Sequence, residues 1–497
     1  MRPRRVRIVD ELGRLASLPA GERAFEVSGR GERALVLGLG PDPAALAEML
    51  PGAGSVQWIE CPEFEAQMAP AWRAAIPGHW ERVGPDQAAR GLERAGLVVV
   101  YARNIRLFPS FWAPVMAACR LSALPGPAAV QDEVWLTGSQ RDLLHLDLVR
   151  SFEEAGMSVR SLAEDPDPAG LADLLRQGRP RLFFSVNLRG LDPLGEVQNL
   201  LHRAGVRVAA WCVDNPYHLL SAMKTRAWRD LDLYVTDHWF LAPLQRDGAR
   251  RVAHLPLAAG SSMFEAAPCA GQEYFADRLV FAGRSCFPGK AGFFAGCRLD
   301  PEAWREARDL LVRGGRPDFA WWRERLGVET LWPGNEVRRA GFAAEESTLA
   351  WRSMCLARAC RVALTVFGDE GWRDVLAGEA DLRGAVDYHD ELPAIYASAG
   401  AVLNVTSLLL PWGLTNRHFD APAAGGIVLT DATPGLAIFP EELVREISFQ
   451  SAKDIPALFG RIMAEPGLRR DLAGAWRGEI AARHAYANRI EHVLEHS

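Results

Sequence analysis

The sequence is poor in the features that mark several common classes of protein. Its eight cysteines form no Cys-x-x-Cys pair, which favours free thiols in a reducing compartment over a disulfide framework or a zinc site. No apolar run approaches the length of a membrane span, and the basic N-terminus lacks the apolar segment of a signal peptide. A formal net charge of -6 does not favour a nucleic-acid or membrane surface. We therefore expect a cytoplasmic protein with no transmembrane segment and no nucleic-acid partner.

The chain has 497 residues, of which 49% are hydrophobic and 24% are charged. This composition is ordinary for globular proteins, and the length is too great for one core, so we expect about two to four domains. The helical pattern that ends near residue 124 is broken by Pro125-Gly126-Pro127. We place a domain boundary at about residue 128 because a new strand pattern begins shortly afterwards.

The first 127 residues are predicted to form a Rossmann-like α/β domain. Strand patterns at 34–37, 55–60 and 97–101 surround the glycine turn Gly38-Leu39-Gly40-Pro41-Asp42-Pro43, and the second strand ends at Glu60. In a Rossmann fold such a turn approaches a phosphate or adenosine, and an acid holds the ribose hydroxyls. The loop departs from Gly-x-Gly-x-x-Gly, so two interpretations stay open. One is a small α/β domain without a ligand, and the other is a methyltransferase-like nucleotide pocket.

From residue 133 onwards, strand and helix patterns alternate regularly. Such alternation predicts a parallel sheet with helices on both faces and with ligands beyond the carboxyl ends of the strands. Three loops at those ends stand out, at residues 137–140, 187–190 and 214–216. The predicted strands are 133–137, 158–162, 181–186, 206–213, 231–236 and 251–256, and the predicted helices are 141–155, 169–177, 194–204 and 217–229.

A second strand, loop, helix, strand unit occupies residues 399–431. An apolar strand at 401–404 is followed by a loop, a short helix at 416–424 that ends at Gly425-Gly426, and a second strand at 427–430. Unpaired N–H groups at the helix start favour a phosphate, Arg417 adds a forked cation, and Asp420 can accept hydrogen bonds from sugar or ribose hydroxyls. The alternative is an amphipathic helix on which Arg417 and Asp420 pair at the surface.

Four blocks of the C-terminal half carry a family resemblance: 387–396, 404–406, 415–420, and 424–426 with 429–431. Together they resemble the nucleotide-binding half of the CgeB-like (spore-protein type) glycosyltransferases. The resemblance implies a two-domain GT-B enzyme that uses a nucleotide sugar, with Thr415 and Asn416 beside Arg417 at the nucleotide diphosphate. Related retaining enzymes carry two acids eight positions apart here, whereas this chain has Trp412 at the earlier position and Asp420 at the later one.

The middle of the chain resembles the amino-terminal half of the same family. The matching segments are 183–187, which ends in Asn187, and 211–216, which reads Trp-Cys-Val-Asp-Asn-Pro. The resemblance places Asn187 and Asn215 on the acceptor side. Asp214 follows a buried strand, and it can orient or deprotonate an acceptor hydroxyl. The alternative is that Asp214 caps the next helix.

Two further segments are predicted to contact the donor. Gly283 follows a strand at 277–282, so the backbone there can approach a ligand, and Arg284 with Lys290 can neutralise a diphosphate. This loop is not a P-loop because the Gly-Lys-Ser/Thr ending is missing. By resemblance, the nucleotide base lies near residues 383–389, where Tyr388 is a candidate for stacking. The alternative for Tyr388 is simple packing in a hairpin.

These observations together predict a GT-B-like pair of Rossmann-like domains, residues 128–265 for the acceptor and 273–480 for the nucleotide sugar. Residues 1–127 precede the pair, and a crossover helix at 481–497 braces the middle domain by resemblance. We expect transfer of a sugar to an unknown acceptor with Asp214 and Asp420 as catalytic residues. No cofactor besides the donor is expected, and no metal, because no plausible loop carries an Asp-x-Asp motif.

Two other function classes stay open. One is a degenerate GT-B protein that binds a nucleotide or a partner without transfer, which Trp412 at the usual acidic position makes conceivable. The other is a methyltransferase-like activity of residues 1–127.

Overall fold

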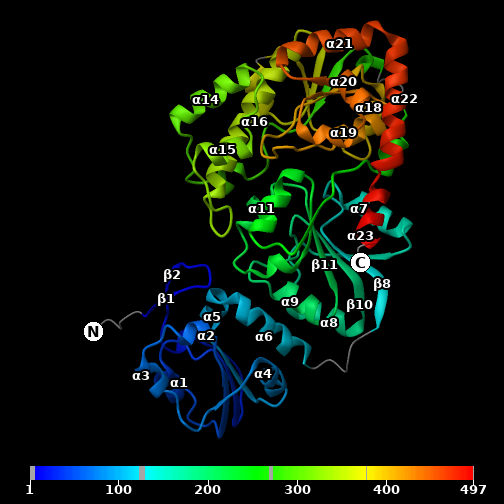
Figure 1. Cartoon of the computed structure of the whole chain (residues 1–497). Helices are drawn as coiled ribbons and strands as arrows, with labels where there is room; N and C mark the ends of the chain where they lie inside the picture. Colours follow the sequence, from blue (N-terminus) through cyan, green and yellow to red (C-terminus); the bar gives the residue numbers. More distant parts are fainter. Residues whose placement is uncertain (1–5, 123–128, 268–272, 377, 496–497) are drawn as a thin grey trace.

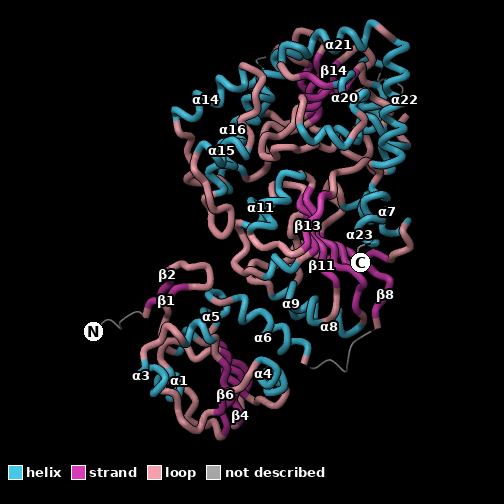
Figure 2. Tube along the Cα trace, in the orientation of Figure 1, coloured by secondary structure: helices cyan, strands magenta, loops and turns pink. Residues whose placement is uncertain are grey.

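The computed structural model describes residues 6–122, 129–267, 273–376 and 378–495. Three α/β units follow one another along the chain, each built on its own sheet (Figures 1 and 2). The predicted fold class is confirmed, because two of these sheets have six strands, all parallel, and the smaller α/β unit precedes them. The predicted break at 125–127 and boundary near 128 lie outside the described residues, as do positions 268–272 between the two predicted domains.

The N-terminal unit contains a five-stranded sheet in the order β3-β7-β4-β5-β6. Strands β4 to β7 are parallel, and β3 joins β7 antiparallel. A separate hairpin of β1 (Arg7–Val9) and β2 (Leu15–Ser17) precedes this sheet. The sheet strands are β3 (Glu26–Gly29), β4 (Arg33–Leu37), β5 (Ser55–Ile59), β6 (Glu81–Arg82) and β7 (Leu97–Val100), and the helices are α1 (Pro43–Glu48), α2 (Pro62–Glu65), α3 (Pro70–Ala74), α4 (Pro85–Leu92), α5 (Ala102–Leu107) and α6 (Pro109–Leu121).

The middle unit is a parallel sheet in the order β13-β12-β11-β10-β8-β9. Its strands follow the predicted apolar runs, but the predicted helix at 217–229 is wrong: a short helix ends at Leu220 and a separate 3-10 turn spans Ala227–Asp230. The strands are β8 (Val130–Thr137), β9 (Ser158–Leu162), β10 (Arg179–Val186), β11 (Arg207–Cys212), β12 (Asp232–Val235) and β13 (Arg251–His254), and the helices are α7 (His145–Glu154), α8 (Pro168–Gln177), α9 (Glu196–Arg203), α10 (Pro216–Leu220), α11 (Leu241–Arg246) and α12 (Ser261–Phe264).

The C-terminal unit is a parallel sheet in the order β16-β15-β14-β17-β18-β19. Its central strands are buried on both faces, as expected where helices cover both sides of a sheet. The strands are β14 (Leu279–Ala282), β15 (Leu364–Phe367), β16 (Asp381–Arg383), β17 (Ala401–Asn404), β18 (Val428–Asp431) and β19 (Ser448–Phe449), and the helices are α13 (Lys290–Phe293), α14 (Pro301–Val312), α15 (Phe319–Arg325), α16 (Val337–Ala359), α17 (Gly371–Leu376), α18 (Leu392–Ser398), α19 (Arg417–Ala423), α20 (Glu441–Ile447), α21 (Ile455–Ala464), α22 (Pro466–Arg483) and α23 (Tyr486–Glu495).

The last helix returns to the middle unit, where α23 lies beside α7 (Figure 1). The two chain crossings between the halves pair with each other through a bridge between Ala259 and Ala485. Arg489 of α23 is buried, and its Nε and Nη2 donate to the carbonyls of Pro256 (2.8 Å) and Leu257 (3.1 Å). The last helix therefore packs on the middle unit, at the place where the resemblance implied a brace.

Candidate active site

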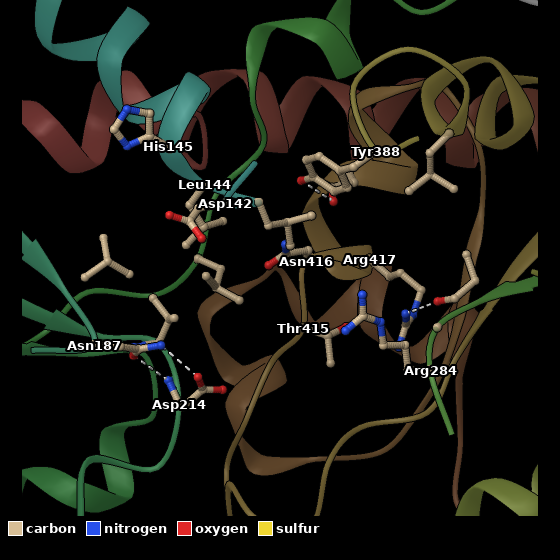
Figure 3. Close-up of a pocket in the computed structure, with 18 of the residues that line it drawn as sticks. Asp142, Leu144, His145, Asn187, Asp214, Arg284, Tyr388, Thr415, Asn416 and Arg417 are labelled. Carbon is tan, nitrogen blue, oxygen red and sulfur yellow. Dashed lines mark hydrogen bonds between the residues drawn. The ribbon is translucent and has the colours of Figure 1, made fainter. Parts of the chain in front are cut away.

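A cavity of about 740 Å³ lies between the middle and C-terminal units. It is lined by residues that follow β8, β10 and β11 on one side and β14, β15 and β17 on the other, so the carboxyl ends of both sheets face it. Figure 3 shows Asn187 and Asp214 on one wall and Arg284 and Arg417 on the other. Ligands of open parallel sheets bind at this position, and the volume falls in the range of small-molecule sites, about 300–1,000 Å³.

Arg417 is fixed at the start of α19 by the ends of two neighbouring strands. Its Nε donates to Oδ1 of Asn404 (2.8 Å), its Nη1 donates to the carbonyl of Ala282, and its guanidinium lies 5.1 Å from the centroid of the Phe281 ring. A Cβ added at Gly283 would lie 3.2 Å from Nη1 of Arg417, so the glycine leaves room for the guanidinium. The cation therefore has a defined position at the cavity wall.

Arg284 is a second cation on this wall, and it is exposed. Within the described part of the chain its guanidinium has no ion-pair partner, and only its backbone carbonyl is engaged, by Arg352 (3.4 Å). Lys290 is different. Its Nζ pairs with Glu346 of α16 at 2.8 Å, and it does not line the cavity. The prediction that Lys290 neutralises a diphosphate is corrected, because a tertiary acid already satisfies its charge.

Asp420 is buried one turn after Arg417. Its Oδ2 accepts a hydrogen bond from the Tyr388 hydroxyl (2.8 Å), whereas its Oδ1 has no partner among the described residues. Burial raises the pKa of Asp420 well above its usual value. The alternative of a surface pair between Arg417 and Asp420 is therefore wrong. Tyr388, Thr415 and Asn416 also line the cavity, and the Thr415 hydroxyl donates to Oδ1 of Asn404 (2.7 Å).

Asn187 holds Asp214 on the middle wall. Asn187 has a left-handed backbone with φ of 57°, and its Oδ1 accepts from the backbone N–H groups of Val213 (2.9 Å) and Asp214 (3.2 Å). Its Nδ2 donates to Oδ2 of Asp214 at 2.7 Å. Asp214 lines the cavity and is exposed there. The surrounding protein nevertheless displaces enough water to raise the pKa of Asp214, while Asn187 and Arg189 oppose the rise.

Asn215, and not Asp214, caps the next helix. Oδ1 of Asn215 accepts from the backbone of Tyr217 (3.1 Å), which makes Asn215 the N-cap of α10, and its Nδ2 donates to the carbonyl of Leu409 (3.1 Å). The capping alternative for Asp214 is therefore wrong. Asn215 is buried and is not a lining residue, so its predicted acceptor contact is corrected: it joins the two halves instead.

Two charged residues on the middle wall were not predicted. Asp142 and Arg189 form an ion pair at 2.6 Å, and Arg189 also pairs with Glu164 at 3.2 Å. Burial raises the pKa of Asp142, but Arg189 outweighs it and the pKa is lowered. The sequence analysis did place the polar loops at 137–140 and 187–190 at the carboxyl ends of strands. The fold brings these two loops together, and the ion pair forms there.

A second contact joins the halves at Trp412, the position at which the resemblance led us to expect an acid. The Trp412 ring stacks on His238 of the middle unit, with centroids 5.2 Å apart and planes 4° apart. The buried Asp237 carboxylate accepts from the backbone N–H groups of Trp239 (2.8 Å) and Trp412 (2.9 Å). Trp412 is not a lining residue of the cavity, so this position serves the contact between the units.

Glu60 in the N-terminal unit is occupied by its own neighbours. Its carboxylate accepts from Leu39 N (2.8 Å), Cys61 N (2.9 Å) and Asn104 Nδ2 (2.6 Å). A Cβ added at Gly38 would lie 3.0 Å from Cβ of Tyr101, which shows how closely the glycine turn is packed. Burial raises the pKa of Glu60 to about 8. These contacts favour the structural interpretation of this turn over a nucleotide pocket.

A match to a known family covers the last part of the chain. Residues 351–495 match the family model described as Glycosyl transferase-like. The matched region includes Tyr388, Thr415, Asn416, Arg417 and Asp420. No curated protein matches the chain.

Several solved structures are similar in fold at low identity. One is Anabaena HepE in complex with UDP-glucose, at 10% identity over 73% of this chain and 100% of that chain, with a TM-score of 0.44. T4 phage BGT in complex with its UDP-glucose substrate is 10% identical over 73% of this chain and 98% of that chain, with a TM-score of 0.40. The lipopolysaccharide outer core galactosyltransferase WaaB is 8% identical over 73% of this chain and 98% of that chain, with a TM-score of 0.36.

No helix in the described ranges is both long and apolar enough to cross a membrane. Nor does any group of three or more His, Cys, Asp or Glu side chains in those ranges have the arrangement of a metal site.

Proposed function

We propose that the protein is a glycosyltransferase that moves a sugar from a nucleotide-diphosphate donor to an acceptor hydroxyl. One observation carries the proposal: the cations Arg284 and Arg417 line one wall of a single cavity, and the carboxylate Asp214 lines the opposite wall. The Glycosyl transferase-like match over residues 351–495 supports it. The motif resemblance further supports membership of the CgeB-like group, with residues 273–480 for the donor and 128–265 for the acceptor.

The donor diphosphate would lie against Arg284 and Arg417. An arginine fork matches two phosphate oxygens, and charge fixed in advance stabilises the leaving diphosphate at little reorganisation cost. Thr415 and Asn416 line the cavity beside this position, and Tyr388 would lie near the nucleotide. Because two arginines are available here, we propose that transfer needs no metal, which predicts unchanged turnover in the presence of EDTA.

The acceptor would enter against the middle unit. Asp214 would take the proton of the attacking hydroxyl, and its raised pKa makes it a stronger base than an ordinary aspartate. Asn187 would hold the carboxylate so that one oxygen faces the cavity. Asp420, which lines the cavity, would contact donor hydroxyls. Closure across the Trp412 contact would keep water away from the donor.

The test is a panel of thermal melts with UDP, GDP, TDP and S-adenosylmethionine, followed by turnover with the matching nucleotide sugars. Arg284→Ala is the test variant, because Arg284 is exposed and its guanidinium has no ion-pair partner among the described residues. Arg373→Ala is the control, since Arg373 is exposed in the same unit and pairs with Glu370, three residues before it. We expect stabilisation by one nucleoside diphosphate that Arg284→Ala removes and Arg373→Ala keeps.

The panel also separates the other two classes. Nucleotide binding without turnover would favour the degenerate binding protein, for which the replacement of an acid by Trp412 is the specific observation. Stabilisation by S-adenosylmethionine alone would favour a methyltransferase-like N-terminal unit and would contradict the proposal.

A further inference from the structure

A second cavity, of about 500 Å³, lies where the N-terminal unit meets the middle unit. Its arginines come just before β12 and β13, at the amino ends of these strands. The candidate active site lies at the carboxyl ends of the strands of the same sheet, so the two cavities lie at opposite ends of these strands. The lining includes Ser110 and Pro114 of α6, Asn199 of α9, and Arg226, Arg229 and Arg250.

Arg229 is held in place by aromatic rings. Its guanidinium lies 5.7 Å from the centroid of Trp228 and 5.3 Å from that of Trp332. Its Nε is enclosed and has no hydrogen-bond partner among the described residues, which also supply no ion-pair partner for this arginine. Gly248, with φ of +100°, lies against it, and a Cβ at that position would be 3.0 Å from Nε. The guanidinium is therefore fixed without an acid to neutralise it.

Two more arginines add charge to the same cavity. Arg226 is exposed, and its Nη2 donates to the backbone carbonyl of Glu11 (3.1 Å). Arg250 pairs with Asp230 at 2.9 Å, and both side chains are substantially exposed. Three cations and one carboxylate line this cavity, which gives it a formal charge of +2.

Acids lie on the far side of Arg226 and Arg229, in a neighbouring cavity lined by Asp10, Glu11 and Glu63. Within the described ranges, none of these acids forms an ion pair with either arginine. Both oxygens of Glu11 already accept hydrogen bonds from Ser110, at 2.8 and 2.7 Å. The forks of Arg226 and Arg229 consequently keep donors for another ligand.

We propose that this cavity binds an oxyanion of the phosphate class through Arg226, Arg229 and Arg250. A guanidinium presents parallel N–H donors that fit a phosphate in two-point contacts, and partial enclosure strengthens the attraction relative to bulk water. The site would give the N-terminal unit a function, because α6 supplies part of the wall. It is separate from the proposed transfer site and does not depend on it.

The test is calorimetric titration of the full-length protein with inorganic phosphate and with glycerol phosphate. Both probes can also enter the proposed donor site, so the titrations use Arg284→Ala as the parent protein. Arg226→Gln and Arg250→Gln are suited as test variants because both side chains are exposed. Arg246→Gln is the control, since exposed Arg246 lies in the same unit and does not line the cavity.

We expect saturable binding to the parent and to the control, and binding weaker by about tenfold in each test variant, as for loss of a charge-assisted hydrogen bond. Added NaCl should weaken binding in the parent. Arg229→Lys, which keeps the charge and loses the fork, should also weaken binding. Tighter binding of glycerol phosphate would indicate an organic phosphate as ligand, and tighter binding of inorganic phosphate would indicate the free ion. Equal affinity of the parent and the Arg226→Gln/Arg250→Gln double variant, or no binding at millimolar phosphate, would overturn the proposal.

Discussion

Asp237 makes the contact between the middle and C-terminal units sensitive to pH. Burial raises the pKa of its carboxyl from the usual 3.8 to about 7, against the opposing effect of the Trp239 and Trp412 N–H groups. Asp318 nearby raises it further, and Arg316 lowers it. As the pH rises from about 4 to about 7, the unfolded chain gives up this proton before the folded protein does. The contribution of this carboxyl to stability is therefore fully present below about pH 4 and is lost as the pH rises through about 7.

The size of the effect follows from the two pKa values. Between pH 5 and pH 7 the folded protein holds a proton that the unfolded chain lacks, and two pH units correspond to about 3 kcal/mol. Asparagine resembles the protonated carboxyl in shape and charge and does not titrate. We therefore expect the free energy of unfolding of the natural protein to fall by about 3 kcal/mol more between pH 5 and pH 8 than that of Asp237→Asn.

Urea unfolding of both proteins at pH 5 and pH 8 measures this difference. Buried carboxyls that do not interact with Asp237, such as Asp420, are present in both proteins, so their contributions cancel in the comparison. The interaction between Asp237 and Asp318 is part of the difference that the Asp237→Asn comparison measures. The same pH dependence for the two proteins would refute the reasoning, because it would mean that the Asp237 carboxyl titrates alike in the folded and unfolded states.

Three further predictions concern the two walls of the cavity and the C-terminal helix. Asn187→Ala removes a hydrogen bond that lowers the pKa of Asp214, so the acidic limb of the pH–rate profile should move to higher pH; an unmoved limb would count against Asp214 as the base. Gly283→Ala forces Arg417 to shift and should raise the donor KM several-fold, whereas an unchanged KM would separate Arg417 from donor binding. Arg489→Met leaves three backbone carbonyls without their donor and should cost about 3 kcal/mol in thermal unfolding; a loss well under 1 kcal/mol would show that α23 is held by packing alone.

The strands of the two parallel sheets were predictable because their apolar runs are continuous. The run at 401–404 became β17, and 34–37 became most of β4. The strand β3 was missed because all four of its residues are exposed, so it carries no apolar pattern, and it pairs antiparallel at the sheet edge. The helix predicted at 217–229 was too long because Lys224 N donates to the carbonyl of Pro193 (2.8 Å), a tertiary bond that turns the chain.

The sequence predicted those residues of the site that follow a strand, but not the tertiary contacts that these residues make. Asn187 and Asp214 were predicted because each comes directly after a strand, and Arg417 was predicted because it begins the helix that follows such a strand. Arg284 and Lys290 looked equivalent on one loop, and the acid that removes Lys290 from the site comes from α16, more than fifty residues later. Asp142 pairs with Arg189 across two loops, which composition and spacing do not reveal.

Calorimetric titration of the nucleoside diphosphate that stabilises the protein in the panel, set beside turnover of the matching nucleotide sugar, tests the central claim most directly, namely that one cavity holds a diphosphate on one wall and a base on the other. For Arg284→Ala we predict weaker binding of that nucleotide by about tenfold, the loss expected for a charge-assisted contact. For Asp214→Asn we predict unchanged nucleotide binding with turnover lower by about 10²–10⁴-fold, as for loss of a general base. Unchanged nucleotide affinity in Arg284→Ala together with undiminished turnover in Asp214→Asn would contradict the account.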